Sequence, residues 1–147
     1  MSVTLRLARP EDHARTLALA IAYHAELGQP TERLDGALGP VLQGLPSAVL
    51  YLIGPPKSPV GYALVSFGHA LHLGGATATI AELFIRPPVR GRGMGGGAVD
   101  ALAKALAPHG VVALYIDAPA ANPRATVFCR RLGFLPSDAR TVMTRLI

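Results

Sequence analysis

The sequence contains no tryptophan, a single cysteine and few aromatic residues of any kind. One cysteine, Cys129, excludes an internal disulfide and is consistent with a reducing compartment, so we expect a cytoplasmic protein. No apolar run approaches the roughly 20 residues that a membrane-spanning helix needs, and no charged segment followed by an apolar one opens the chain. These absences predict a soluble, unexported protein with no membrane partner.

Acidic residues are outnumbered by basic ones, and the formal net charge is +5. A nucleic-acid-binding surface would combine such charge with stacking aromatic rings, but no Phe or Tyr lies among the arginines near the glycine-rich segment, so we expect no nucleic-acid partner. Six of the twelve arginines lie between residues 86 and 131, and this clustering fits a ligand with three phosphate groups. The length of 147 residues, half of them apolar, predicts a single domain over residues 1–147.

Five glycines stand close together, at positions 91, 93, 95, 96 and 97. A β-prone run over residues 77–85 precedes them and a helical apolar pattern follows, which indicates a strand-to-helix connection rather than a flexible linker. Each glycine in a first helical turn costs about 1 kcal/mol relative to alanine. Without Cβ atoms, the backbone N–H groups can close around a phosphate where the helix dipole favours negative charge. The segment therefore predicts an anion site, to which Arg86, Arg90 and Arg92 add positive charge.

A dinucleotide fold is one alternative for this site. Gly91, Gly93 and Gly96 satisfy G-x-G-x-x-G, and Asp117 stands about where a ribose-binding acid would be. However, a segment with two prolines separates the strand from the glycines, and about thirty residues after Asp117 are too few for the remaining βαβ units. An NAD-binding protein therefore stays the weaker alternative, and the P-loop pattern is absent.

Three segments carry a family resemblance. Residues 90–95, reading RGRGMG, match the [QR]-x-x-G-x-[GA] motif of the GNAT superfamily of acyl-CoA-dependent N-acyltransferases, and they follow E-L-F-I and two prolines. Residues 122–125, NPRA, and 131–134, RLGF, resemble the N-x-x-A and L-G-F segments of that family. Residues 5–12, LRLARPED, resemble its opening strand and helix start. The resemblance therefore spans nearly the whole chain.

The resemblance implies an α/β fold with a mixed, mostly antiparallel sheet, a central parallel pair of splayed strands, and flanking helices. It implies acetyl-CoA as cosubstrate and no metal. By resemblance, the backbone of Leu83, Phe84 and Ile85 would face the pantetheine arm. The pyrophosphate would be held by the glycine-rich loop, and the expected cofactor-binding residues there are Arg90, Gly91, Arg92, Gly93, Met94, Gly95 and Gly96. Asn122 is expected among the cofactor-binding residues as well.

The hydrophobic pattern predicts the order of the elements. A strand over residues 3–9 leads into a helix with Leu17, Ile21 and Ala25 on one face. The remaining expected elements are a helix over 32–42, strands over 48–53, 60–67 and 77–85, a helix from near residue 91, a strand over 111–116, a helix from residue 122, and a last extended strand over 141–147.

Glu82 is the candidate general base. N-acetylation needs a neutral amine, so the site must remove a proton from an ammonium and return one to the departing thiolate. On a regular strand Ile80, Glu82 and Phe84 share one face, which would place the carboxylate in an apolar row. An ion pair or a carboxylate at an open sheet face is the alternative interpretation. His24, His69 and His72 are second candidates, and His69-x-x-His72 lacks the further ligands of a zinc site.

Cys129 stands where the family commonly has a tyrosine, four residues before the glycine of L-G-F. A thiol can donate a proton, which makes Cys129 a catalytic candidate. However, Ala125, Phe128, Cys129 and Leu132 form one apolar helical face, which favours a packed side chain instead.

The expected function is acetyl transfer from acetyl-CoA to a primary amine of a small molecule or peptide, with a carboxylate or a water-relayed base. The alternative is a module that binds or senses CoA with little transferase activity, as the loss of the usual tyrosine permits. The oligomeric state stays open, and a homodimer is compatible with the sequence.

Overall fold

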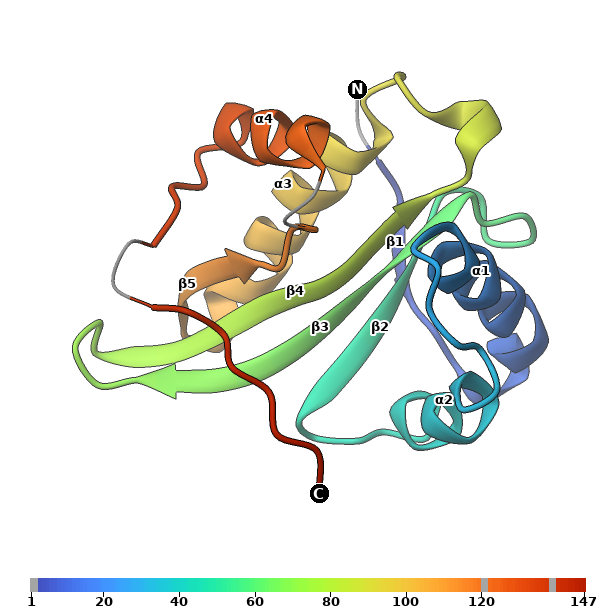
Figure 1. Cartoon of the computed structure of the whole chain (residues 1–147), viewed down its shortest axis with the longest axis horizontal. Coiled ribbons are helices and arrows are strands. Elements are labelled where there is room, and N and C mark those ends of the chain that lie inside the picture. The colour runs from blue at the N-terminus through green and yellow to red at the C-terminus, as the bar shows by residue number, and fades with distance from the viewer. Residues whose placement is uncertain (1–2, 120–121, 138–139) are drawn as a thin grey trace. The chain divides into compact units, whose positions relative to one another are not determined.

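The computed structural model describes residues 3–119, 122–137 and 140–147. The chain divides into two compact units, residues 1–117 and 118–147. The larger unit holds one five-stranded sheet with the strand order β1-β2-β3-β4-β5, and the smaller one holds α4 (Figure 1). The strands are β1 (Leu5–Leu7), β2 (Ala48–Ile53), β3 (Gly61–Ala70), β4 (Gly75–Ile85) and β5 (Val111–Ile116), and the helices of the larger unit are α1 (His13–Glu26), α2 (Leu34–Leu42) and α3 (Met94–Leu106).

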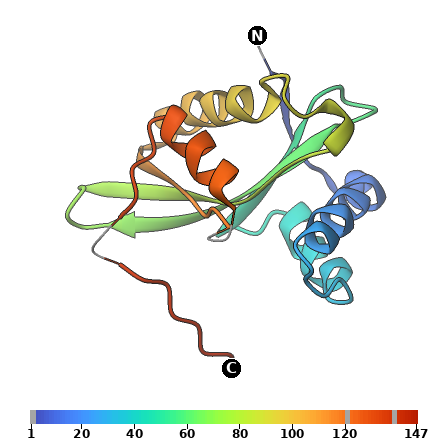
Figure 2. The same ribbon diagram turned by 45° about the horizontal axis from the view of Figure 1, so that its top comes forward.

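The sheet is mixed, which confirms the predicted fold class. Strands β1 to β4 pair antiparallel with their neighbours, whereas β4 and β5 run parallel. A parallel pair needs a long crossover, and α3 supplies it. Figure 2 shows α3 on one face of the sheet, with α1 and α2 on the other. Each face of the sheet therefore has its own apolar layer.

The layer beneath α1 and α2 joins buried residues of three strands, among them Leu50, Leu52, Tyr62 and Phe84, to Leu19, Ala20 and Leu38. The face of α1 that packs here differs from the predicted one. Its buried positions are Thr16, Leu19 and Ala20, whereas Ile21 and Ala25 are exposed. Leu17 is partly buried and packs against this layer, so the predicted face is right at Leu17 and wrong at Ile21 and Ala25. The helix carries apolar residues on more than one side, so the apolar period alone did not distinguish the packed face.

A β-bulge interrupts β4 beside Glu82. Leu64 of β3 faces Glu82 and Val65 faces Ile80, so one step along β3 matches two steps along β4 and Ala81 is the extra residue. Since neighbouring residues on a strand point to opposite faces, Ile80 lies on the face opposite to Glu82 and Phe84. The predicted row of Ile80, Glu82 and Phe84 is therefore wrong, and Glu82 shares the α1 face with Phe84 only.

In the smaller unit, α4 (Pro123–Arg131) begins where the sequence predicted. The side-chain oxygen of Asn122 accepts hydrogen bonds from the N–H groups of Arg124 (3.0 Å) and Ala125 (3.4 Å), which caps the helix. The predicted strand over 141–147 does not form, because residues 140–147 are irregular and exposed. A strand requires a neighbour to bond with, and the described part of this unit contains one helix and no strand. Among the described helices, none has the length and apolar character to cross a membrane.

Candidate functional site

The second half of β4 is paired with β3 on one side and with no described strand on the other. Pairing with β5 ends at Ile80, whose carbonyl accepts the N–H of Asp117 at 3.0 Å, and no described strand continues beside residues 81–85 on that side. Toward β3, the N–H of Arg86 donates to the carbonyl of Val60 at 2.8 Å. Because polar groups alternate along an antiparallel pair, Phe84 directs its backbone toward β3, whereas Leu83 and Ile85 direct theirs to the open side. Two of the three residues expected to face pantetheine therefore have backbone groups at this edge.

The glycine-rich loop leads from β4 into the N-terminus of α3. Gly91 and Gly93 have φ values of +79° and +78°, and Gly93 is the residue before the first helical turn. Gly97 donates its N–H to the carbonyl of Gly93 at 2.9 Å, and within the described ranges the N–H groups of residues 91–96 have no backbone acceptor outside the helix itself. No heavy atom lies within 4 Å of a Cβ built on Gly91 or Gly93. These free donors fit an anion such as a pyrophosphate.

The arginines of the loop differ in what they bind. The Nε of Arg90 donates to the carbonyl of Ile85 at 2.8 Å, and its terminal nitrogen bonds Glu26 at 2.7 Å. The guanidinium also lies over the ring of Phe84, 5.6 Å from the centroid. Arg92 is exposed and forms no ion pair with any residue whose position is described. Arg90 therefore connects β4 to α1, whereas the exposed guanidinium of Arg92 is accessible to a ligand.

Glu82 carries a carboxylate held by two side chains. The hydroxyl of Tyr62 donates to Oε1 at 2.6 Å, and Nε2 of His24 lies 3.1 Å from the same oxygen. The side chains of Glu82 and His24 are 23% and 13% exposed. Burial raises the pKa of Tyr62 and the bond to Glu82 raises it further, so Tyr62 stays a phenol that donates. The result is an oriented, half-buried carboxylate.

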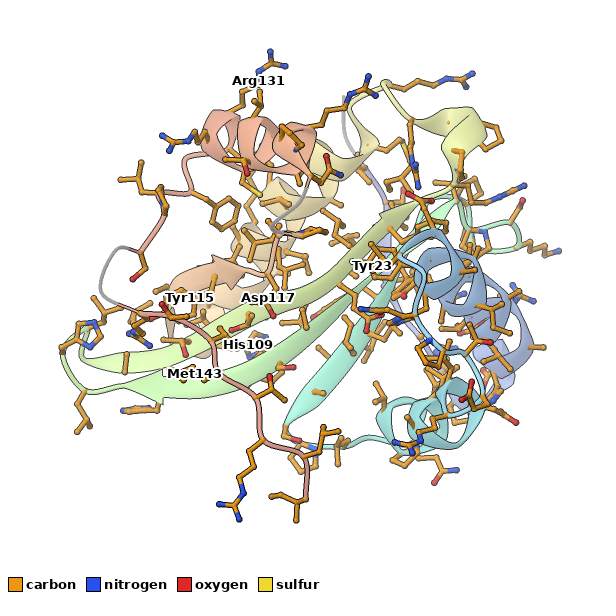
Figure 3. The ribbon with its side chains drawn as sticks, in the orientation of Figure 1. Tyr23, His109, Tyr115, Asp117, Arg131 and Met143 are labelled. Atoms are coloured by element: carbon orange, nitrogen blue, oxygen red, sulfur yellow. The ribbon has the colours of Figure 1, made fainter. Side chains whose placement is uncertain are left out.

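Tyr23 completes the aromatic side of this group. Its ring packs edge-on against His24 at 5.2 Å and Tyr62 at 6.2 Å, and tilted against Phe84 at 5.7 Å. Burial raises the pKa of Tyr23, and the negative charge of Glu82 adds to the effect. Figure 3 shows Tyr23 where α1 passes over the sheet. The carboxylate of Glu82 is therefore bordered by neutral aromatic side chains.

The three candidate histidines are not together. His69 and His72 are exposed at the hairpin between β3 and β4. His69 lies five residues along β3 from Leu64, the partner of Glu82, which corresponds to about 17 Å. His24 alone of the three contacts Glu82. Gln29, whose Oε1 lies 2.6 Å from Nδ1 of His24, was missed, because a lone glutamine after a helix carries no sequence signal.

Cys129 and Asn122 belong to the smaller unit and each has a structural environment there. Cys129 is buried, and burial raises the pKa of its thiol, which therefore stays protonated. The side-chain oxygen of Asn122 is used as the cap of α4. Both predicted roles, proton donor and cofactor ligand, stay predictions.

Comparison with known proteins identifies the relatives of this chain. No curated protein matches the sequence. Among solved structures, a ribosomal-protein-alanine N-acetyltransferase from Brucella melitensis biovar Abortus 2308 has a TM-score of 0.81 at 16% identity, covering 99% of this chain and 100% of that one. An aminoglycoside N-acetyltransferase in complex with CoA has a TM-score of 0.80 at 17% identity, with 98% and 94% covered.

A third structure is an aminoglycoside acetyltransferase from an uncultured soil metagenomic sample, in complex with sisomicin. Its TM-score is 0.77 at 12% identity, and the match covers 99% of this chain and 96% of that one. At such low identities the similarity is one of fold. The profile of the acetyltransferase (GNAT) family matches residues 19–134, which include β4, the glycine-rich loop and Glu82. Because that match covers most of the sequence, this chain belongs to the acetyltransferase (GNAT) family.

Proposed function

We propose that this acetyltransferase transfers the acetyl group of acetyl-CoA to a primary amine of a small molecule or peptide, with Glu82 as general base. The observation that carries the proposal is the position of Glu82. Glu82 lies on β4, two residues past the point where the pairing with β5 ends. Its carboxylate is oriented by Tyr62 of β3 and His24 of α1. A base is useful only beside the place where the acceptor and the thioester can meet.

The chain offers groups that fit acetyl-CoA. The N–H groups of residues 91–96 and the exposed guanidinium of Arg92 suit the pyrophosphate, and the backbone of Leu83 and Ile85 can bond an extended arm. When bound, acetyl-CoA supplies the thioester carbonyl that the amine attacks. The residues of the loop thereby orient the cosubstrate and take no part in proton transfer.

Glu82 has a defined task at neutral pH. A primary amine with a pKa near 10 arrives mostly as an ammonium, which has no lone pair for attack. The carboxylate removes that proton, and a well-positioned base contributes roughly 10²- to 10⁴-fold in rate. Tyr62 remains a phenol and keeps the carboxylate in one orientation. Neighbours of this fold include enzymes named for aminoglycosides and for ribosomal-protein alanine, so both acceptor classes belong in a screen.

Release of free CoA thiol, followed with a thiol reagent over a panel of amines, tests the proposal, and mass spectrometry identifies the acetylated product. For Glu82→Gln, we expect turnover to fall by about a hundredfold or more while the acetyl-CoA Kd stays nearly constant. The defect should shrink as pH rises, since more acceptor then arrives neutral. Glu32→Gln is the matched control, because Glu32 is exposed and forms no ion pair in the described part of the chain.

Two results would contradict the proposal in different ways. Wild-type turnover of Glu82→Gln across the pH range would remove Glu82 from the mechanism. Thermal stabilisation by acetyl-CoA without thiol release from any amine would favour the CoA-binding module instead.

A further inference from the structure

His24 lies between Glu82 and Gln29 in the last turn of α1. Its Nε2 is 3.1 Å from Oε1 of Glu82, and its Nδ1 is 2.6 Å from Oε1 of Gln29. The end of the helix fixes this arrangement. Gly28 adopts φ +69°, the N–H of Gly28 donates to the carbonyl of Ala25, and the N–H of Gln29 donates to the carbonyl of His24 itself. This closing turn brings the side chain of Gln29 back onto the imidazole of His24.

A count of hydrogens shows how many protons the triple of Glu82, His24 and Gln29 can hold. The oxygen of Gln29 requires a hydrogen on Nδ1 of His24, and a bond from Nε2 to the carboxylate requires a second hydrogen on the ring. The ring carries both only as an imidazolium. With a single hydrogen, on Nδ1, the lone pair of Nε2 faces Oε1 and suits a protonated carboxyl group. The arrangement therefore has one place for a proton between Glu82 and His24.

We propose that His24 is a positioning residue that receives, on Nε2, the proton that Glu82 removes from the acceptor, while Gln29 holds the imidazolium by accepting from Nδ1–H. The inference rests on the proposed function and extends it beyond Glu82. The proton moves from the ammonium to Oε1 and then to Nε2, which restores the carboxylate. This proton then passes from His24 to solvent, and it is the one proton that amine acetylation releases overall. The second proton, which the amine loses after it has attacked the thioester, goes to the thiolate.

The charges around His24 suit a transient imidazolium. Glu82 on β4 faces it directly, and Glu26 on α1 is already paired with Arg90 at 2.7 Å. The phenols of Tyr23 and Tyr62 have pKa values raised by burial, so both are neutral neighbours. Asp117, at the end of β5, is a further carboxylate whose charge contributes to the raised pKa of Tyr23. Among the described residues, Glu82 is therefore the one carboxylate that lies within hydrogen-bond distance of the ring, and it is the group from which the ring takes the proton.

The test compares the pH profiles of kcat/KM of wild type with those of variants substituted at His24 and at Gln29. His24→Gln can still donate to Glu82 but cannot take up a proton. We expect kcat to fall about tenfold at pH 7, less than the loss of the base itself, with the acetyl-CoA Kd unchanged. Gln29→Glu should move the acidic limb to higher pH by about one unit, because a second carboxylate favours the imidazolium, and Gln29→Leu should move it to lower pH.

His13→Gln is the matched control. His13 lies on the same helix and bonds Asp35, so its substitution should leave the pH profile as in wild type. Gln29 is exposed, so its substitutions keep the test valid should His24→Gln fold poorly. Equal profiles for wild type, Gln29→Glu and Gln29→Leu would overturn the proposal, as would wild-type turnover of His24→Gln. These results leave the proposed function standing if Glu82→Gln is impaired, whereas a wild-type protein that acetylates no amine rejects the proposed function itself.

Discussion

Asp12 gives a quantitative test of how α1 is held in place. Its carboxylate is 5% exposed and receives both terminal nitrogens of Arg6 on β1, at 2.7 and 3.0 Å, together with the N–H of Arg9 at 2.8 Å. The hydrogen bond from Arg6 is the largest cause that lowers the pKa of Asp12 from 3.8 to about 2, and burial opposes it. This contact joins the first strand to the start of the helix that carries His24.

The shift in pKa converts into stability. Lowering the pKa of Asp12 by nearly 2, at about 1.4 kcal/mol for each pH unit, gives about 2.5 kcal/mol in the free energy of unfolding at pH 7. Since the folded pKa is the lower one, the contribution is complete above the unfolded value and is lost as pH falls through the folded one. By pH 3 about half of it should be gone.

Asp12→Asn removes the charge and keeps the shape. Urea denaturation at pH 7 should show a loss of about 2.5 kcal/mol in the free energy of unfolding, and the difference between variant and wild type should narrow toward pH 3. Glu11→Gln is the control, because that carboxylate is 68% exposed and its contact with Arg9 is 4.0 Å, so we expect a change below about 0.5 kcal/mol. A gap for Asp12→Asn that does not depend on pH would refute the electrostatic reasoning.

Two further predictions concern the loop and the cysteine. Gly93→Val should raise the acetyl-CoA Kd at least about tenfold, because φ at this position is +78° and a branched side chain covers the N–H groups. Gly74→Val is the control: φ is +79° there, in the hairpin between β3 and β4, so the backbone strain should be similar while the Kd stays unchanged. Isothermal titration measures both, and equal Kd values would place the phosphates elsewhere. Cys129→Ala should cost about 1 kcal/mol by thermal denaturation and keep most turnover, while a hundredfold loss of turnover would make the thiol a proton donor.

Much of the fold is predictable from the sequence because its signals are local. The strands at residues 48–53 and 111–116 have the predicted bounds, since each is an apolar run flanked by turn residues. The helix at Asn122 begins as expected because a capping side chain and a proline act within one turn. The glycine-rich loop, which we propose as the anion site, is likewise encoded in a short stretch of the sequence, with glycines at the two positions of positive φ before α3.

The predictions that failed have a common cause: each depends on contacts with residues that are distant in the sequence. The packed face of α1 depends on the sheet beneath it, and a strand over 141–147 depends on a neighbour to bond with. The contact between His24 and Gln29 depends on how a helix ends, and the contact of His24 with Glu82 joins residues 58 positions apart. The hydrophobic periodicity of the sequence does not encode contacts between residues so far apart in the chain.

The bulge at Ala81 shows how one irregular residue builds the site. Ile80 is fully buried, on the sheet face away from α1 and α2, whereas Glu82 faces α1 opposite Leu64. A regular strand would place both side chains on one face, so either Ile80 would lose its packing or Glu82 would point away from His24 and Tyr62. The extra residue allows both, and the same step turns the backbone of Leu83 and Ile85 toward the edge that β5 leaves open. The proposed base and the proposed cosubstrate edge therefore depend on one local feature of β4.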